Sequence, residues 1–517
     1  MTQQQLLNPL ARKLFLAEQV RRLDKTAIED CNIPGRVLMK RAGRECFEFL
    51  LAQWPNPEKM TIFCGGGNNG GDGYVIAALA AQSNIPVQVL SLVDPMTLKG
   101  DAALAFQYAL QENVEVLPFS SNVAAPEQGV IVDALLGTGL SGVVKPEYRQ
   151  AIDLINSSNL PVMSVDIPSG ICADTGAVLG CAVKAQATAT FIGMKFGLTT
   201  GRAVDYVGEL RFFDLQVPAE IHERLTPFAD CLYLDELLSQ VSDRAAGSHK
   251  GDFGHLLVIG GAEGMGGAAL MAAEASVRLG AGRVSAATQG ANSIAFLTRV
   301  PEVMARSVSD VHEIAPLLEQ ATAIAIGPGL GQTPWSEQMF QAAVNANKPL
   351  IIDADGLNLL ARDSYAQMLR SHQSADCILT PHPGEAARLL GVSTADIQNN
   401  RHQAAQQLAS KYRANVVLKG AGTLVITGFE NDQTVSVCRY GNPGMAGGGM
   451  GDVLTGVIAS LIAQGFEVGL AVKLGVSLHS VAAEQLANQY GERGLLATDL
   501  IPVIRALLNN VEDSFHD

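Results

Sequence analysis

Two Gly-rich runs, each placed directly in front of a helical segment, constrain this chain more than any other feature. The first, 64-CGGGNNGGDG-73, follows the apolar run 60-MTIFC-64 and precedes the helical stretch 74-YVIAALAA-81. The second, 442-NPGMAGGGMGDVLTG-456, lies near the other end of the chain. Glycine permits positive φ and close approach of a ligand to the main chain, and the first turn of a helix has unpaired N–H groups. Each run therefore predicts a site for an anionic ligand at a helix N-terminus.

Neither run matches the better-known phosphate-binding motifs. No Lys-Ser or Lys-Thr pair follows the glycines, as a P-loop would require. The GxGxxG-like match at residues 65–70 is weak, because Ser91 stands where a dinucleotide-binding fold would place an acidic residue. From the glycines alone, a purely structural turn and a phosphate site both stay open.

Short apolar runs that alternate with helical or Gly/Pro-rich segments predict an α/β fold with parallel, doubly wound sheets. Helical spacing over residues 14–30 and 36–54 predicts two helices ahead of a first strand at 60–64. The further segments expected to contain strands are 87–93, 130–137, 162–168 and 187–193 in the first half, and 255–282, 322–331, 349–361, 376–391 and 414–428 in the second.

The alternation lapses at residues 214–231, which contain two prolines and several charges. A chain of 517 residues exceeds the usual size of one domain. We therefore expect one domain over residues 1–220 and another over 230–517. Because the halves share no fixed repeat period, they are two different domains joined together and not a duplication.

Composition and charge exclude several classes of partner. Hydrophobic residues make up 48% of the chain and aromatic residues 5%, as in Ala/Val/Leu-rich α/β layers. A formal charge of −15 argues against a nonspecific surface for nucleic acid or for an anionic membrane. Anionic ligands must then be bound locally, by backbone N–H groups.

The scattered cysteines and the absence of signal or membrane segments predict a soluble, cytoplasmic protein. The eight cysteines contain no C-x-x-C pair and no zinc-like grouping with histidine, which is typical of a reduced compartment. The N-terminus lacks the apolar core and cleavage site of a signal peptide. The longest apolar region, 453–466, is too short to span a bilayer and predicts a buried helix.

At the level of whole motifs, the chain resembles the NAD(P)H-hydrate repair family. In the first half, 64-CGGGNNGGDG-73, 17-AEQVRRLDKTAIE-29, 133-DALLGTGLSG-142 and 165-VDIPSG-170 are similar to the epimerase domain of that family. In the second half, 247-GSHKGDFGHLLVIGG-261, 327-GPGLG-331, 380-TPHPGE-385, 419-KGAGT-423 and 442-NPGMAGGGMGD-452 resemble its dehydratase domain. The resemblance implies a Rossmann-like three-layer epimerase domain followed by a ribokinase-like α/β domain.

By this resemblance, two loops of the first half hold the substrate, a reduced nicotinamide nucleotide that has added water at C6 of its ring. Backbone donors would meet its phosphates, and the Asn side chains offer both donors and acceptors. The residues implied are Asn68, Asn69, Gly70, Gly71 and Asp72 in the first loop, and Gly137, Thr138, Gly139, Leu140, Ser141, Gly142 and Val143 in the second.

Epimerisation at C6 requires that carbon to become trigonal for a moment, so a proton must move at the hydroxyl or at the ring nitrogen. Asp166, at the end of the run VMSVD, is the candidate for that carboxylate and for a substrate contact. The alternative is an aspartate that caps the turn before Pro168.

The resemblance also implies a potassium ion bound by Asn69, Asp133 and Ser169. Hard oxygen ligands from three separate strand ends suit such a cation. The sequence does not show that these residues converge, and Asp133 can also be read as an ordinary strand-end aspartate.

In the second half, the glycines at residues 447–451 would form an anion hole and Asp452 would be the base. In ribokinase-like proteins such a turn stabilises charge on a transferred phosphoryl group, and the adjacent Asp takes the proton of the acceptor hydroxyl. The alternative for Asp452 is a helix N-cap.

The family dehydrates the S epimer, with ADP as the phosphoryl donor in bacterial-type members. Lys419 can also be read as a solvated lysine at a strand end. The implied nucleotide-binding residues are Lys419, Gly420, Ala421, Gly422, Thr423, Asn442, Pro443, Gly444, Met445, Ala446, Gly447, Gly448, Gly449, Met450 and Gly451.

Four residues are implied to contact the substrate of the dehydratase: Ala268, Gly329, His382 and Asp452. His382 stands where ribokinases usually have Asn, although a lone histidine is often an ordinary surface or packed residue. Glu385 resembles the acidic residue that helps to hold Mg²⁺ through water. Asp353 and Asp355 could join it, and the sequence leaves that open.

Together these implications describe a bifunctional isomerase and lyase that acts on NADHX and NADPHX, uses ADP as co-substrate, and contains K⁺ and Mg²⁺. We expect a homo-oligomer, with no nucleic-acid and no membrane partner. Two other readings remain: a ribokinase-like small-metabolite kinase with a regulatory first half, and a first half that serves as a binding scaffold.

Overall fold

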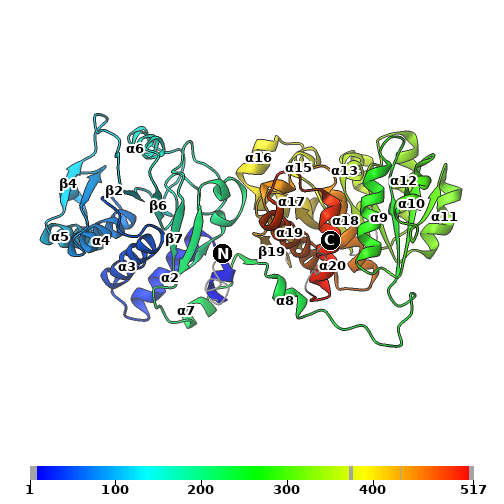
Figure 1. Ribbon diagram of the computed structural model, residues 1–517, viewed down its shortest axis with the longest axis horizontal. Helices are drawn as coiled ribbons and strands as arrows, with labels where there is room; N and C mark the ends of the chain where they lie inside the picture. Colours follow the sequence, from blue (N-terminus) through cyan, green and yellow to red (C-terminus); the bar gives the residue numbers. More distant parts are fainter. Residues whose placement is uncertain (1–8, 372–375, 431, 512–517) are drawn as a thin grey trace. The chain divides into compact units, whose positions relative to one another are not determined.

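The computed structural model divides the chain into two compact units, Met1–Asp230 and Cys231–Asp517. In Figure 1 the first unit is coloured from blue to green and the second from green to red. The structure describes residues 9–371, 376–430 and 432–511. The division between the units falls at the end of the segment 214–231, where the alternation of strands and helices lapses in the sequence.

The first unit is built on a parallel sheet with the strand order β4-β3-β2-β5-β6-β7-β9. Strand β2 pairs with β3 on one side and with β5 on the other, so the strand order reverses between β2 and β5. Such a switch point at the carboxyl ends of parallel strands is where open α/β sheets bind ligands. The strands are β2 (Met60–Cys64), β3 (Val87–Ser91), β4 (Glu115–Pro118), β5 (Val130–Ala134), β6 (Val162–Val165), β7 (Ala187–Phe191) and β9 (Glu209–Phe213).

Alternation along the central strands produces three layers in this unit. Ile62 and Cys64 of β2 belong to one core, and Phe63 between them belongs to another on the opposite face of the sheet. The first core is covered by α2 (Ala17–Glu29), α3 (Gly35–Gln53), α4 (Asn68–Gln82) and α5 (Gly100–Gln111), and the second by α6 (Pro146–Ser157).

Three features differ from the sequence expectation. Helix α4 begins at Asn68, so residues 68–72 lie in its first turns and not in a loop. A short strand, β1 (Lys13–Phe15), precedes α2 and pairs in parallel with β8 (Met194–Lys195). Strands β4 and β9 also occur, and β4 is mostly exposed, so its sequence lacks the apolar run used to find the others.

The second unit contains a larger sheet with the order β13-β12-β11-β14-β15-β16-β17-β18-β19. The strands are parallel from β13 to β17 and antiparallel from β17 to β19. Their bounds are β11 (His255–Ile259), β12 (Arg283–Thr288), β13 (Met304–Ser307), β14 (Ala323–Ile326), β15 (Leu350–Ile352), β16 (Cys377–Leu379), β17 (Asn415–Leu418), β18 (Thr423–Thr427) and β19 (Thr434–Cys438).

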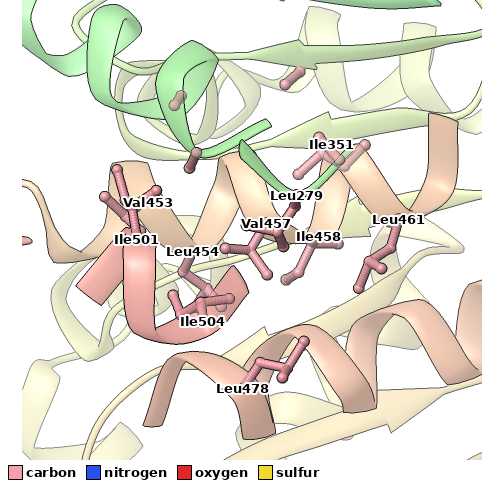
Figure 2. Packing of buried hydrophobic residues seen from close by; sticks show 14 of the residues in the cluster. Leu279, Ile351, Val453, Leu454, Val457, Ile458, Leu461, Leu478, Ile501 and Ile504 are labelled. Atoms are coloured by element: carbon pink, nitrogen blue, oxygen red, sulfur yellow. The ribbon is translucent and has the colours of Figure 1, made fainter. Parts of the chain in front are cut away.

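One apolar helix organises the core of this unit. Helix α18 (Met450–Ala463) is the expected buried helix, and nearly all of its residues are buried. Figure 2 shows Val457 and Ile458 of α18 between Ile351 of β15 and Leu478 of α19 (Val468–Tyr490). Helices α9 (Gly266–Arg278) and α20 (Leu500–Leu508) complete this layer. The Gly-rich run at 442–451 is thereby fixed to a rigid helix.

Further helices connect the strands from β13 to β17 along the chain. Their bounds are α11 (Val311–Gln320), α12 (Pro334–Asn345), α13 (Ala354–Leu360), α14 (Asp363–Arg370), α15 (Pro383–Leu390), α16 (Thr394–Asn399) and α17 (Arg401–Tyr412). Helices α13 and α15 begin directly after β15 and β16, so their N-termini lie at the carboxyl edge of the sheet.

Candidate active sites

In the first unit, Asp133 and Ser169 meet at the carboxyl edge of the sheet. Asp133 is fully buried in β5, and its carboxylate accepts hydrogen bonds from the Ser169 backbone N–H (2.9 Å) and hydroxyl (2.6 Å). The hydroxyl of Ser164 also donates to it, over 2.8 Å. Burial raises the pKa of Asp133, and the hydrogen bonds from the two serines oppose that rise. The structure thus brings together two of the three residues expected to bind potassium.

Asn69, the third of these residues, lies in the first turn of α4 and not at a strand end. Its Oδ1 and Nδ2 atoms are buried and have no hydrogen-bond partner within the described part of the chain. A Cβ placed on Gly137 would lie 3.4 Å from the Asn69 Cβ, and the neighbouring Leu136 N–H donates to the Ser169 hydroxyl over 2.9 Å. Because an unpaired buried amide is costly, the orphaned oxygen fits the role of a cation ligand.

Asp166 follows β6 in an unusual backbone conformation, with φ 65°. Its Oδ1 accepts hydrogen bonds from the Phe191 N–H (3.4 Å) and the Thr190 hydroxyl (3.5 Å), and it pairs with the ammonium group of Lys195. These partners lie on β7 and β8, so the carboxylate does not cap the turn before Pro168. Non-glycine residues at positive φ are costly and cluster at functional sites.

Two further carboxyl groups lie near this pair. Asp24 of α2 has its pKa raised to about 6, by burial first, while the charge of Lys195 opposes the rise. Asp72 of α4 has a raised pKa because it is buried and because Asp166 and Asp24 carry like charge. The sequence motifs pointed to Asp72 as a site residue but not to Lys195 or Asp24. A charged residue inside the apolar run 191-FIGMKFGL-198 was the one signal that could have revealed Lys195.

The second loop predicted to bind the substrate, residues 137–143, connects β5 to α6. It begins with a turn in which the Leu140 N–H donates to the Gly137 carbonyl over 3.2 Å. Gly142 has φ 75° and Val143 is 70% exposed, so this part of the loop lies at the surface. Its first residues are the part that lies next to Asn69.

In the second unit, the Gly-rich run ends at the N-terminus of α18. Gly449, with φ 90°, occupies the N-cap position, and Asp452 is the third residue of the helix. The reading of Asp452 as the N-cap is therefore wrong. Burial raises the pKa of Asp452 to about 7, and the negative charge of Asp353 adds to the rise. A carboxyl group in this range can exchange a proton near neutral pH.

Lys419 and Asp353 form an ion pair next to Asp452. The Lys419 Nζ lies 2.8 Å from the Asp353 Oδ1, and the Thr455 hydroxyl donates to the other carboxylate oxygen over 2.8 Å. The Lys419 side chain is 20% exposed, so the reading as a solvated strand-end lysine is wrong. A Cβ on Gly451 would lie 3.1 Å from the Lys419 Nζ, so the start of α18 lies close to this ammonium group.

His382 and Glu385 form a capping box at the start of α15. The His382 Nδ1 accepts hydrogen bonds from the N–H groups of Gly384 (3.0 Å) and Glu385 (3.3 Å), and Glu385 accepts from the His382 N–H over 2.8 Å. The imidazole is 51% exposed, so its outer edge remains accessible. Burial and the charge of Lys419 lower the pKa of His382, and burial raises that of Glu385 to about 7.

The other predicted residues of this unit surround the same edge. A Cβ on Gly329 would lie 3.2 Å from that of Ala268, so the two predicted substrate contacts are neighbours. The Gly331 N–H donates to the Asp355 carboxylate over 2.9 Å, which ties the GPGLG loop to α13.

The two loops predicted to bind the nucleotide are both fixed by hydrogen bonds from buried or neighbouring side chains. The buried Arg401 guanidinium donates to the carbonyls of Leu418 (3.2 Å) and Lys419 (3.1 Å) at the start of the loop 419–423. The side chain of Asn442 accepts from the Gly444 N–H (2.9 Å) and donates to the Ala483 carbonyl of α19 (3.0 Å).

Within the described residues, no three His, Cys, Asp or Glu side chains gather as a metal site. The carboxylates of the second unit mostly bond to protein groups, such as Asp353 to Lys419 and Glu385 to the His382 N–H. Direct coordination of Mg²⁺ by several of them is not apparent, and a water-mediated contact through Glu385 fits better. Among the same residues, none of the helices has the length and apolarity to cross a membrane.

Family models of known proteins match both units of the chain. A family model described as NAD(P)H-hydrate dehydratase matches residues 256–506, and one described as YjeF-related protein N-terminus matches residues 35–197. The crystal structure of a ribokinase-like superfamily protein from Enterococcus faecalis has a TM-score of 0.50 and 27% identity, and covers 55% of this chain and 97% of that one. The second unit therefore has a ribokinase-like fold.

Two curated relatives match almost from end to end. A protein of Coxiella burnetii named bifunctional NAD(P)H-hydrate repair enzyme is 44% identical over 496 residues, which cover 96% of this chain and 99% of that protein. The protein of the same name from Vibrio cholerae is 43% identical over 505 residues, with 97% and 99% covered. The chain belongs to the family of bifunctional NAD(P)H-hydrate repair enzymes.

Proposed function

We propose that this chain repairs hydrated NADH and NADPH in two steps. The first domain, residues 1–220, interconverts the R and S forms of the hydrate. The second domain, residues 230–517, dehydrates the S form to NAD(P)H and converts ADP to AMP and phosphate. One observation carries the proposal: each unit has its own group of partly buried carboxylates at the carboxyl edge of its sheet, beside a Gly-rich helix N-terminus.

In the epimerase site, Asp166 moves the proton that allows C6 to become trigonal. Within the part of the chain that the structure describes, the hydrogen bonds of its carboxylate all end on Oδ1, which leaves Oδ2 for the substrate. Of residues 68–72, those ahead of Gly71 present backbone N–H groups to the phosphates, since the Gly71 N–H already donates to the Gly67 carbonyl over 3.1 Å. The loop 137–143 closes over the same edge.

In the dehydratase site, the hydroxyl at C6 is a poor leaving group until it is phosphorylated. Asp452 takes the hydroxyl proton as the oxygen attacks the terminal phosphorus of ADP, and AMP departs. The N–H groups of residues 447–451 stabilise the charge on the transferred phosphoryl group. Loss of phosphate from C6, together with a proton of the ring, then restores the reduced nicotinamide.

Two metal ions belong to this proposal. Asn69, Asp133 and Ser169 would hold K⁺, and the orphaned amide of Asn69 supports this placement. Glu385 would bind a water of Mg²⁺, which supplies charge neutralisation at the phosphates of the nucleotide. The ion pair with Asp353 holds the ammonium group of Lys419 at the start of the loop 419–423.

We further propose that the protein is cytoplasmic and forms a homo-oligomer. All eight cysteines are free thiols, which suits a reducing cytoplasm. The homo-oligomer is proposed on the basis of the family resemblance.

The direct test is to give the purified protein hydrated NADH and ADP and to follow the absorbance of reduced nicotinamide. The absorbance should return, and AMP and phosphate should form in equal amounts. A stable phosphorylated product without recovery of the absorbance would instead identify a small-metabolite kinase.

A further inference from the structure

Lys195 reaches the epimerase site through a reversal of the chain after β7. Ile192 has φ 61°, which is a rare conformation for a β-branched residue, and the Gly193 N–H bonds back to the Phe191 carbonyl over 2.6 Å. The turn leads into β8, where Lys195 stands opposite Phe15 of β1. His222 of α7 (Glu220–Glu223) fixes the turn, with its Nε2 2.6 Å from the Ile192 carbonyl oxygen.

The lysine side chain is almost completely removed from water. It is 1% exposed, against 17% for Asp166, and its ammonium group bonds to the Phe191 carbonyl (3.0 Å) and to the Asp166 Oδ1. Burial of an ammonium group carries a desolvation cost, which its bonds to a carbonyl and to a carboxylate offset. The strained turn at Ile192 places the buried Lys195 ammonium group against the Asp166 Oδ1. Packing alone would not require a charged group at this position.

The charges that face Asp166 come from several elements. Asp24 of α2 and Asp72 of α4 carry like charge, and Cys46 of α3 is a buried thiol. Lys195 opposes the charge of both Asp24 and Asp72. The Lys195 ammonium group therefore interacts electrostatically with three carboxyl groups, those of Asp24, Asp72 and Asp166.

We propose that Lys195 is a positioning residue of the epimerase: it holds Oδ1 of Asp166, directs Oδ2 at the substrate, and offsets the charge of the surrounding carboxyl groups. This inference rests on the proposed epimerase function. It makes a distinctive claim, because removing the cation and removing a neighbouring anion must change the pH dependence of the reaction in opposite directions.

The test compares Lys195→Met and Asp24→Asn with wild type in the full-length protein. The R/S ratio of hydrated NADH is followed by chromatography without ADP, between pH 5 and 9. In Lys195→Met, we expect kcat/KM at pH 7 to fall tenfold or more and the acid limb of the pH profile to move up by about one unit. In Asp24→Asn, the acid limb should move down.

Dehydration of the S epimer in the same preparations reports folding of the second unit, and the melting temperature reports folding of the first. If both variants keep the wild-type pH profile, the positioning role is wrong, whatever the loss of rate. If Lys195→Met fails to fold, Lys195→Arg replaces it, since it keeps the cation and changes its geometry: a fall in rate with an unmoved acid limb supports the positioning role, and a wild-type rate overturns it. If the wild type itself does not epimerise the hydrate, the proposed function fails first, and the two failures are distinguishable.

Discussion

Asp452 and Asp166 are both carboxylates that lie close to a lysine, yet their hydrogen bonds differ. Asp166 pairs directly with Lys195, whereas Lys419 is paired with Asp353 and acts on Asp452 only through its charge. The raised pKa of Asp452 suits a group that takes a proton from a hydroxyl near neutral pH. Asp166 is instead a fixed carboxylate with one oxygen already bonded.

Replacing Asp452 by Asn should therefore abolish dehydration and leave epimerisation intact. A positioned base contributes about 10²–10⁴ to a rate, and we expect a loss of that size. The measurements are the absorbance of reduced nicotinamide with ADP, and the R/S ratio without it. Asp243→Asn, at an exposed position of the same unit, is the matched control. Dehydration above a tenth of the wild-type rate would refute the assignment.

The potassium site can be tested at Asn69 with little damage to the fold. Its amide has no hydrogen-bond partner among the described residues, so Asn69→Ala removes no bond, whereas a change at Asp133 would remove the hydrogen bonds that its carboxylate accepts from Ser164 and Ser169. In wild type, K⁺ in place of Na⁺ should speed epimerisation and raise the melting temperature.

Asn69→Ala should lose both responses to K⁺. Gln82→Ala, at the other end of α4, should keep them. Equal epimerisation rates in the two wild-type buffers would remove the cation from the proposal.

At the scale of elements, the N-terminus of α18 combines exposed glycines with one that is closely packed. Residues 447 and 448 are exposed, but Gly451 fits closely against Lys419 and Asp353. A Cβ on Gly448 would meet nothing within 4 Å. Any effect of Gly448→Ala on function must then arise from a ligand and not from the protein.

We expect Gly448→Ala to leave the melting temperature unchanged and to raise the KM for ADP by about tenfold, or about 1.4 kcal/mol. The added methyl group would occupy the space through which a phosphate reaches the backbone N–H groups. Gly247→Ala, which also has nothing within 4 Å, is the control outside the site. An unchanged KM would place the phosphates elsewhere.

The central strands of both sheets could be predicted from the sequence because they are short and mostly apolar, as β2 and β5 are. Strands β12 and β13 were missed, since Arg283, Ser285 and the exposed β13 break that pattern. The start of α4 was also misplaced, because glycine and asparagine favour turns more than helices.

For the candidate sites, the family resemblance pointed to Asp133 and Ser169. The structure shows that the Ser169 hydroxyl donates a hydrogen bond to the Asp133 carboxylate. Lys195 and Asp24 were missed because their role depends on contacts between distant segments, which no local pattern encodes.

At the scale of the whole molecule, each unit has its own core. The cores of the first unit contain residues 15–221, and the core around α18 contains residues 232–504, with none in common. Strand β1 pairs with Ala229 and Asp230, so a cut after residue 230 keeps this pairing within the first unit. The two units are therefore expected to fold separately.

Separate units would show why the two activities are joined in one chain. Hydration yields both C6 epimers, yet a base and a phosphoryl donor fixed on one side of a pocket reach only one hydroxyl configuration. Given both epimers and ADP, the fragment 231–517 should consume the S fraction quickly and then stall, apart from slow spontaneous epimerisation. Adding the fragment 1–230 should restore full conversion, and the same fragment carrying Asp166→Asn should not. If the fragment 231–517 consumed both epimers at equal rates, the first unit would not serve it as an epimerase.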